Sequence, residues 1–443
     1  MPINRIENNH KLAVGHAGLT FIQQMAEIIE FERLANIVNI GNPVISTSDV
    51  LTSMLGLLAQ GKTDYAHIEE FRGNAFFMNV LGLRQVPSEE TYRQRFKDIA
   101  TNTNLASLLP AYSVKLYNRL GMEPVVIEKD GQQWIRVDVD PVIYDNSDTK
   151  KEGTEHTYNK QFGYAPIFAH LDGGWMVNAQ LNPGNTSFHG PNTINFVNQS
   201  LDYADKISAV TKLLVTDCGL EDQQFLEVLL ARENTDFIIK HNQRRESSTT
   251  WLEVAKTQGR LVRENKAKGY RIYQGSTYRH LKSSKKMLRL VFEVREIFKK
   301  DGRNLLLPEV KLFSVWTSIE SFSEQEILRL YRLRGTSEQY HAEFKSEMDM
   351  ERPPSDNFQV NNAFLLMGML AHNMLKAIAL DMVKDEGLGL KQASRRRVRT
   401  VMRSVILMAG RIVKGGRRLT MQLGCPKEWF RWFNSLFQRL KAV

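Results

Sequence analysis

The feature that most constrains this 443-residue chain is a change of hydrophobic period at residue 134. From there to residue 240 the pattern predicts the order β-β-β-α-β-α-β. The turn Asp172-Gly173-Gly174 joins the second and third strands into a hairpin. Three antiparallel strands followed by βαβ units predict a mixed five-stranded sheet with flanking helices. The predicted strands are 134–140, 164–170, 175–181, 212–217 and 236–240, and the predicted helices are 192–206 and 222–232.

The rest of the chain divides around this sheet. Residues 1–125 are predicted to form a helical region, followed by a linker over 121–130. Residues 241–320 interrupt the core (130–240 and 321–385) with a basic insertion, and 386–443 form a basic helical C-terminal region. The strands predicted in the insertion are 251–254, 270–274, 288–294 and 310–317.

The segment 323–350 is predicted to be one helix. Ser323 and Glu326 form a capping box, which satisfies two backbone donors at a helix start. At about 100° per residue, one face then carries a ring, a guanidinium, a carboxylate and an ammonium group. These belong to Tyr331, Arg334, Glu338 and Lys345. Such a face suits a phosphodiester with metal ions; the alternative is a solvated face with pairs such as Arg334–Glu338.

The charge and the cysteines narrow the class of protein. A net charge of +10 and a pI of about 9.4 favour a polyanion as partner, meaning nucleic acid or an anionic membrane. Cys218 and Cys425 have no CxxC spacing, which fits a reducing cytosol. The N-terminus lacks a signal-peptide pattern. The apolar segment 363–383 includes His372 and Lys376, so a buried helix is favoured over a membrane span.

Two basic regions are candidates for nucleic-acid contact. The segment 391–420 holds ten Lys and Arg residues and no acid, which fits phosphate contact, an acidic protein partner or a solvated face. Four of these cations are Arg395, Arg396, Arg397 and Arg399. The helix that begins after Ser88 is either the second helix of a DNA-binding pair or a surface helix. An aromatic helix near 429–437 is expected to pack rather than stack on bases.

Three acids are placed to act together. Asp140 lies on the first strand, Asp217 ends the fourth, and Glu338 is on the late helix. The strand order resembles RNase H-like folds, in which the first and fourth strands are neighbours. Clustered carboxylates repel one another, and a divalent metal ion removes that penalty. Two such ions activate a nucleophile and stabilise the leaving oxygen.

The chain resembles DDE transposases with a Tyr-x2-Arg-x3-Glu-x6-Lys helix, nearest the group 1 (insertion-sequence 1380) family. The motifs are VDVDPVIYDNS, GYAPIFAHL, LNPGNTS, VTDCG and LYRLRGTSEQYHAEFK. The resemblance implies the catalytic and metal-binding triad Asp140, Asp217 and Glu338, which would bind two Mg²⁺ or Mn²⁺ ions. It also implies DNA contacts by Tyr331, Arg334 and Lys345.

Some assignments stay open at this point. Asp138 shares a strand face with Asp140 and is an alternative first acid, while Asp145 and Asp148 are weaker candidates. Trp316 is either a core residue or a side chain that stacks on a flipped base.

The sequence therefore predicts a transposase that binds terminal inverted repeats, cleaves the ends and joins 3′-hydroxyls to target DNA. The alternatives are a nuclease without strand transfer and a non-catalytic, transposase-derived DNA-binding protein; a membrane-surface protein is a remote fourth. The expected assembly is a homodimer in a synaptic complex, in a bacterial cytoplasm and at the nucleoid when acting.

Overall fold

A mixed sheet forms the centre of the protein. The computed structural model describes residues 15–37, 44–243, 246–281, 286–415 and 418–443. The sheet order is β7–β6–β2–β8–β9, with β1 on β2, and β2 runs parallel to β8 and antiparallel to β6. The strands are β1 (Val126–Lys129), β2 (Gln132–Pro141), β6 (Ile167–Leu171), β7 (Trp175–Gln180), β8 (Thr211–Thr216) and β9 (Thr235–Lys240). The predicted mixed sheet is confirmed, whereas the RNase H-like comparison stays a prediction.

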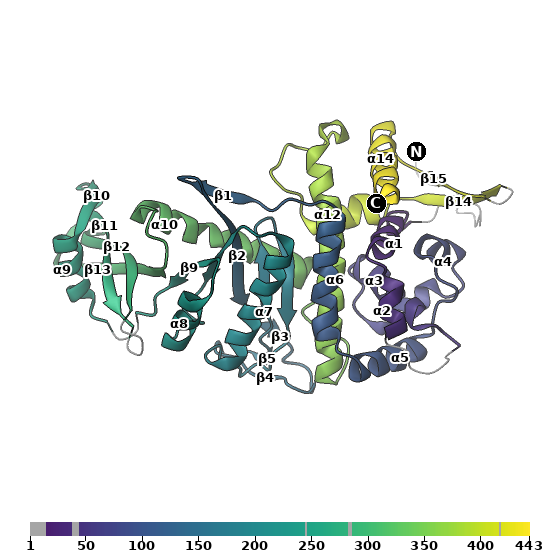
Figure 1. Cartoon of the computed structure of the whole chain (residues 1–443), viewed down its shortest axis with the longest axis horizontal. Coiled ribbons are helices and arrows are strands. Elements are labelled where there is room, and N and C mark those ends of the chain that lie inside the picture. Colours follow the sequence, from purple (N-terminus) through teal and green to yellow (C-terminus); the bar gives the residue numbers. More distant parts are fainter. Residues whose placement is uncertain (1–14, 38–43, 244–245, 282–285, 416–417) are drawn as a thin grey trace.

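The two faces of β2 pack against different helices, because successive side chains of a strand point to opposite sides. Ile135, Val137 and Val139 join the main core. Trp134, on the other face, packs in a second core cluster that includes α10 (Glu324–Arg332). Helices of the core sheet and its surroundings are α6 (Leu105–Arg119), α7 (Pro191–Ile207), α8 (Gln223–Ala231) and α12 (Phe358–Lys384). Figure 1 shows α7 in front of the sheet, with α6 and α12 to its right, between the sheet and the N-terminal helices.

The insertion continues the central sheet instead of forming a separate one. Its strand β13 pairs with β9, so that ten strands of the described residues share one sheet. Its elements are α9 (Ser248–Gln258), β10 (Gly259–Asn265), β11 (Tyr270–His280), β12 (Met287–Lys300) and β13 (Arg303–Thr317). The strand predicted at 251–254 is wrong: Trp251 and Ala255, four residues apart, are the buried face of α9. The expected linker also contains β1.

Helices from the two ends of the chain pack together at one end of the molecule (Figure 1). Phe21 of the first helix contacts Phe433 of the last at a ring distance of 4.3 Å, so the aromatic helix packs as predicted. The N-terminal helices are α1 (Leu19–Ile28), α2 (Phe31–Ile37), α3 (Thr47–Leu58), α4 (Ala75–Leu81) and α5 (Glu89–Asn102). The C-terminal helices are α13 (Val398–Val401), a π-helical turn η5 (Met402–Ile406) and α14 (Lys427–Ala442).

Two small sheets complete the fold. One is formed by β3 (Tyr144–Asp145), β4 (Glu155–His156) and β5 (Phe162–Tyr164). The other is the hairpin of β14 (Gly410–Gly415) and β15 (Arg418–Leu423), in a region that was predicted to be helical. Among the described helices, α12 alone has the length and apolarity to cross a membrane, but 89% of its apolar window is buried inside the protein.

Candidate active site at the ends of strands β2 and β8

Asp140 and Asp217 lie side by side at one edge of the sheet. The parallel strands β2 and β8 pair Val139 with Thr216. Asp140 follows Val139 within β2, and Asp217 directly follows the last residue of β8. Because neighbouring strands are about 4.8 Å apart, the two carboxylates share one level at the carboxyl ends. The two strand acids predicted from the sequence are therefore brought together.

The two carboxyl groups differ in their affinity for protons. Burial raises the pKa of Asp140 to about 6; the nearby Arg334 opposes this shift, and the charge of Asp217 adds to it. Burial would also raise the pKa of Asp217, but hydrogen bonding with Cys218 and the charge of Arg334 outweigh it and lower the pKa. Near neutral pH, the Asp217 carboxyl group is thus more completely ionised than that of Asp140.

Arg334 and His341 face the Asp140 carboxylate from residues 323–350, called here the late helical segment. The Arg334 guanidinium forms an ion pair with Asp140 Oδ1, and both side chains are 14% exposed. His341 Nδ1 lies 3.7 Å from Asp140 Oδ2. Burial, with the charge of Arg334, lowers the pKa of His341 to about 3, so the imidazole is neutral. Sequence reasoning missed His341, although its spacing of seven residues from Arg334 places both on one helical face.

The segment that carries these residues is not the single helix predicted. The capping box of Ser323 and Glu326 is present at the start of α10. A 3₁₀ turn, η2 (Leu333–Thr336), then separates α10 from α11 (Ser337–Ala342), and a π-helical turn η3 (Glu343–Glu347) follows. Gly335 lies inside the 3₁₀ turn, where its weak helix propensity favours an interruption. Because the chain is not a continuous α-helix here, residues on either side of the turn do not follow the rotation of about 100° per residue that placed Tyr331, Arg334, Glu338 and Lys345 on one face.

Only one of the four residues on the predicted face contacts the strand acids directly. Tyr331 is buried in the second core cluster, with its ring 5.3 Å from that of Phe313. Lys345 Nζ donates to the carbonyl of Ile143 at 2.9 Å and pairs with Glu351 at 2.8 Å. Glu338 is exposed and forms no ion pair with any residue in the described ranges. Of these four residues, Arg334 is the one that pairs with Asp140.

A complete metal-binding group is absent from the described part of the chain. No three His, Cys, Asp or Glu side chains there are arranged to hold an ion. The donors nevertheless fit a divalent cation in part, because Asp140 and Asp217 supply two neighbouring carboxylates, the ligand type that Mg²⁺ prefers. The third predicted ligand, Glu338, does not join them in this structure.

Asp138, the alternative first acid, already has a partner. Its Oδ1 accepts two hydrogen bonds from the Arg136 side chain, at 2.6 and 3.1 Å, and the pair is buried. Asp145 accepts hydrogen bonds from Ser147, and Asp148 lies on the surface. Of these acids, Asp140 stands next to Asp217 in the strand register.

Trp316 occupies the core position that the sequence left open. It is 4% exposed, and its indole N–H donates to Glu221 at 2.8 Å. Glu221 also contacts His241, whose other ring nitrogen contacts Glu246 at 2.9 Å. Stacking of Trp316 on a DNA base stays a prediction, and it would require the side chain to leave this network.

The arginine-rich segment folds against the late helical segment. Arg395 pairs with the buried Glu343, and Arg397 pairs with Glu347. Lys376 of α12 also lies 3.7 Å from Glu343. Two of the four arginines predicted to contact DNA therefore have carboxylate partners within the protein, while Arg399 is exposed.

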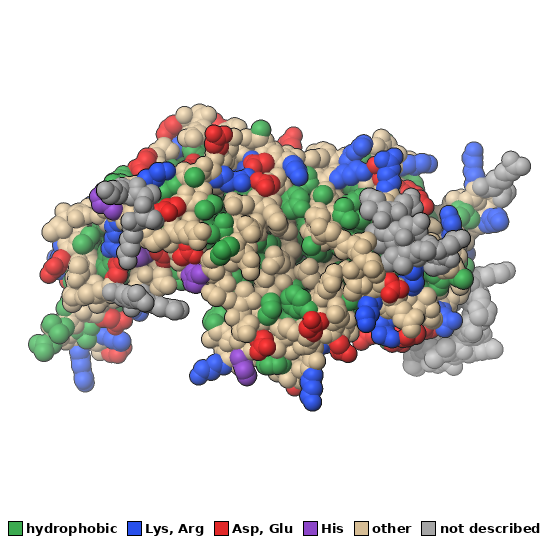
Figure 2. Space-filling model, turned by 60° about the horizontal axis from the view of Figure 1, so that its bottom comes forward, with side chains coloured by type: hydrophobic (Ala, Val, Ile, Leu, Met, Phe, Trp, Pro, Cys, Tyr) green, Lys and Arg blue, Asp and Glu red, His purple; other side chains and the backbone are tan. Residues whose placement is uncertain are grey.

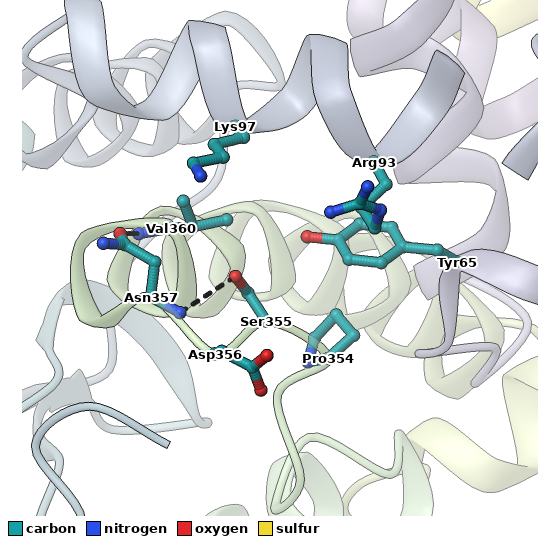
Figure 3. A pocket seen from close by; sticks show the side chains of 8 residues that line it. All are labelled: Tyr65, Arg93, Lys97, Pro354, Ser355, Asp356, Asn357 and Val360. Carbon is teal, nitrogen blue, oxygen red and sulfur yellow. Dashed lines mark hydrogen bonds between the residues drawn. The ribbon is translucent and has the colours of Figure 1, made fainter. Parts of the chain in front are cut away.

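The N-terminal basic helix α5 borders a small hollow (Figure 3). Arg93 and Lys97 reach this hollow from α5, and Asp356 and Asn357 border it just before α12. Arg93 is paired with Glu90, at 2.7 Å. The hollow is lined by Tyr65, Arg93, Lys97, Pro354, Ser355, Asp356, Asn357 and Val360. Arg93 and Lys97 belong to the helix that the sequence offered as a candidate for DNA contact, and the other lining residues were not predicted to be site residues.

These features define an α/β protein with paired acids at the carboxyl ends of adjacent parallel strands. Comparison with known families places it more narrowly. The chain belongs to the family described as transposase DDE domain group 1, whose sequence model matches residues 7–443.

Solved structures provide a further comparison. The chain is similar to one described as the cryo-EM structure of the piggyBac transposase synaptic complex with hairpin DNA. The identity is 9% and the TM-score 0.44, over 90% of this chain and 82% of that chain. No curated protein sequence is significantly similar to the chain.

Proposed function

We propose that this protein is a metal-dependent DNA transposase that binds the terminal inverted repeats of its element. In this proposal it cleaves the element ends and joins their 3′-hydroxyls to target DNA. The observation that carries the proposal is that Asp140 and Asp217 lie side by side at the ends of neighbouring strands, with Arg334 paired to Asp140. Membership in a transposase family supports it.

The residues take separate roles in this proposal. Asp140 and Asp217 would hold Mg²⁺ or Mn²⁺, with Glu338 as the third carboxylate. Bound metal would supply activation of the attacking oxygen and stabilisation of the leaving oxygen. Arg334 neutralises Asp140 in the protein alone; a DNA phosphate offers the same guanidinium a matching partner. The neutral His341 beside Asp140 would position that carboxylate.

DNA binding would extend well beyond these residues. The net charge of +10 favours a polyanionic partner. The region 1–125, the insertion and the basic C-terminal region would share the contacts with terminal repeats and target. A synaptic complex with two ends would require at least a homodimer of this chain.

Excision from a supercoiled plasmid that carries both element ends tests the proposal. The reaction is run with Mg²⁺ and with EDTA, using wild type, Asp140→Asn, Asp217→Asn and Glu338→Gln. Asp138→Asn is included to test the alternative first acid. We expect metal-dependent excision that is lost in the first three variants, and integration into a second plasmid.

Other outcomes would change the assignment. Loss in Asp138→Asn with activity kept in Asp140→Asn would move the first acid by two residues. Excision that survives EDTA would refute the metal mechanism. Cleavage without integration would indicate a nuclease, and DNA binding without cleavage would indicate a non-catalytic protein.

A further inference from the structure

The hairpin of β14 and β15 extends away from the body of the protein. Figure 1 shows it as a narrow two-stranded arm beyond the N-terminal helices. The described strands pair in a continuous antiparallel register from Gly410↔Leu423 to Gly415↔Arg418. At about 3.4 Å per residue, six-residue strands give an arm of roughly 20 Å. Nothing else in the described fold packs over the outer half of this arm, where the residues are exposed.

The base of the arm is fixed to the body. The backbone N–H of Ala17 donates to Met408 at 2.9 Å, and Gly424 donates to Ala409 at 2.9 Å. Ile412 and Met421 are half-buried against the main core. The arm therefore has a defined exit direction, which a partner could use for orientation.

One face of the arm consists largely of hydrogen-bonding side chains. In the observed register, Arg411 stands opposite Gln422 and Val413 opposite Thr420, with Arg418 farther out on the same face. Arg411 Nε donates to Gln422 Oε1 at 2.6 Å, so these two side chains contact each other from neighbouring strands. Lys414 lies on the opposite face, near the outer end.

The positive charges of the arm have no carboxylate partners within the described part of the protein. The sequence holds no Asp or Glu between Glu386 and Glu428. Within the described residues, Arg411, Lys414 and Arg418 form no ion pair with a carboxylate. They differ in this respect from Arg395 and Arg397, which are neutralised by the late helical segment. Figure 2 shows Lys and Arg side chains gathered at the end of the molecule that bears the arm.

We propose that the β14–β15 hairpin is a DNA-reading arm that enters the major groove of a duplex. The major groove is about 12 Å wide and admits a two-stranded β-ribbon. In this arrangement Arg411, Arg418 and Gln422 face base edges, to which Arg and Gln side chains form paired hydrogen bonds. Lys414 faces a phosphate. The inference rests on the proposed function, because it assigns a specific surface to recognition of the element ends.

A polyanion suits this surface better than a second copy of the chain. Two arms placed together would bring cations of like charge into contact, which is unfavourable. DNA supplies the missing negative charge along the whole length of the arm. Pairing between copies is nevertheless a distinct outcome that the test below separates.

The test is binding of the full chain to fluorescein-labelled 30-base-pair duplexes, measured by anisotropy in EDTA over a range of salt. One duplex carries an element end and the other has the same base composition in scrambled order. The variants are Arg411→Ala/Arg418→Ala and Lys414→Ala. The matched control is Arg411→Lys/Arg418→Lys, which keeps the charge but loses the paired donor geometry.

We expect the double alanine variant to lose about 10-fold or more of its preference for the element end. The lysine control should lose the same preference while keeping the salt dependence of wild type. Lys414→Ala should weaken binding to both duplexes equally and lower the slope of log affinity against log salt by about 0.9. Unchanged thermal melting of each variant checks that the fold is intact.

Different failures are distinguishable. Wild type that binds neither duplex would refute the proposed function itself. Wild type that prefers the element end, with the same preference in the double alanine variant, would refute only the arm. Equal loss on both duplexes from the arginine changes would refute base reading. A change in sedimentation of the free protein, with DNA affinity unaltered, would instead assign the arm to contacts between copies.

Discussion

The raised pKa of Asp140 predicts that this acid destabilises the folded protein at neutral pH. Its pKa is about 6 in the fold against 3.8 as the ordinary value, mainly because the side chain is buried. Between these two values the folded state binds a proton that the unfolded state does not. Stability therefore falls as pH rises from about 4 to 6, and this rise in the pKa of Asp140 corresponds to about 3 kcal/mol.

Asp140→Asn should remove this penalty, because Asn keeps an oxygen that can accept from Arg334 and no longer places a second negative charge beside Asp217. Arg334 keeps the charge of Asp217 nearby, unlike the cations around Glu343, which share that one carboxylate. We expect the variant to be more stable than wild type by up to about 3 kcal/mol at pH 7.5. The advantage should vanish near pH 4. The measurement is urea unfolding in EDTA, followed by circular dichroism at several pH values.

Asp217→Asn provides a control of opposite sign. The pKa of Asp217 is lowered in the fold, so its ionised form stabilises the protein. We expect this variant to be less stable than wild type at pH 7.5, with the deficit shrinking as pH falls below the ordinary Asp value. An Asp140→Asn variant that is no more stable than wild type, or whose advantage is independent of pH, would refute the reasoning.

Three further predictions concern contacts around the site and the core. Arg334→Gln should raise the pKa of Asp140 by a further 1–3 units or so. Mn²⁺ binding, measured by calorimetry over a range of pH, should then have its acidic midpoint at a higher pH than in wild type. An unchanged midpoint would contradict this. Glu343→Gln leaves buried cations without their carboxylate and should cost about 3–5 kcal/mol in urea unfolding. Gly18→Ala should cost about 1–3 kcal/mol, because a Cβ there would lie 2.3 Å from the Val405 carbonyl oxygen; unaltered thermal melting would show that the backbone can shift.

The sequence predicted the parts of the fold that depend on local pattern. The succession of strands along the chain, and the acids at the ends of β2 and β8, followed from hydrophobic period and chain order. The pairing of β2 with β8 was expected from the resemblance to RNase H-like folds. The capping box at Ser323 was also local, and it is present. These features depend on residues close together in sequence, where period and capping chemistry operate.

The remainder depends on contacts between distant residues. A helical projection assigns Arg334 to a face, but its pairing with Asp140 depends on the turn at Gly335 and on packing against the sheet. The neutral state of His341 likewise follows from burial, which no spacing reveals. The β14–β15 hairpin was missed because its alternating residues are mostly exposed and its charge dominated the interpretation.

The buried Glu343 connects assembly of the site to the order of synthesis. Its carboxylate is fully buried beside Lys376, and its closest partner, Arg395, comes 52 residues later in the chain. Val398 also donates its backbone N–H to Glu343, at 3.1 Å. A nascent chain in which all residues of the central sheet and both strand acids have been synthesised therefore still lacks these two donors. We therefore expect the helical segment around Glu343 to reach its final packing only after translation has passed residue 398.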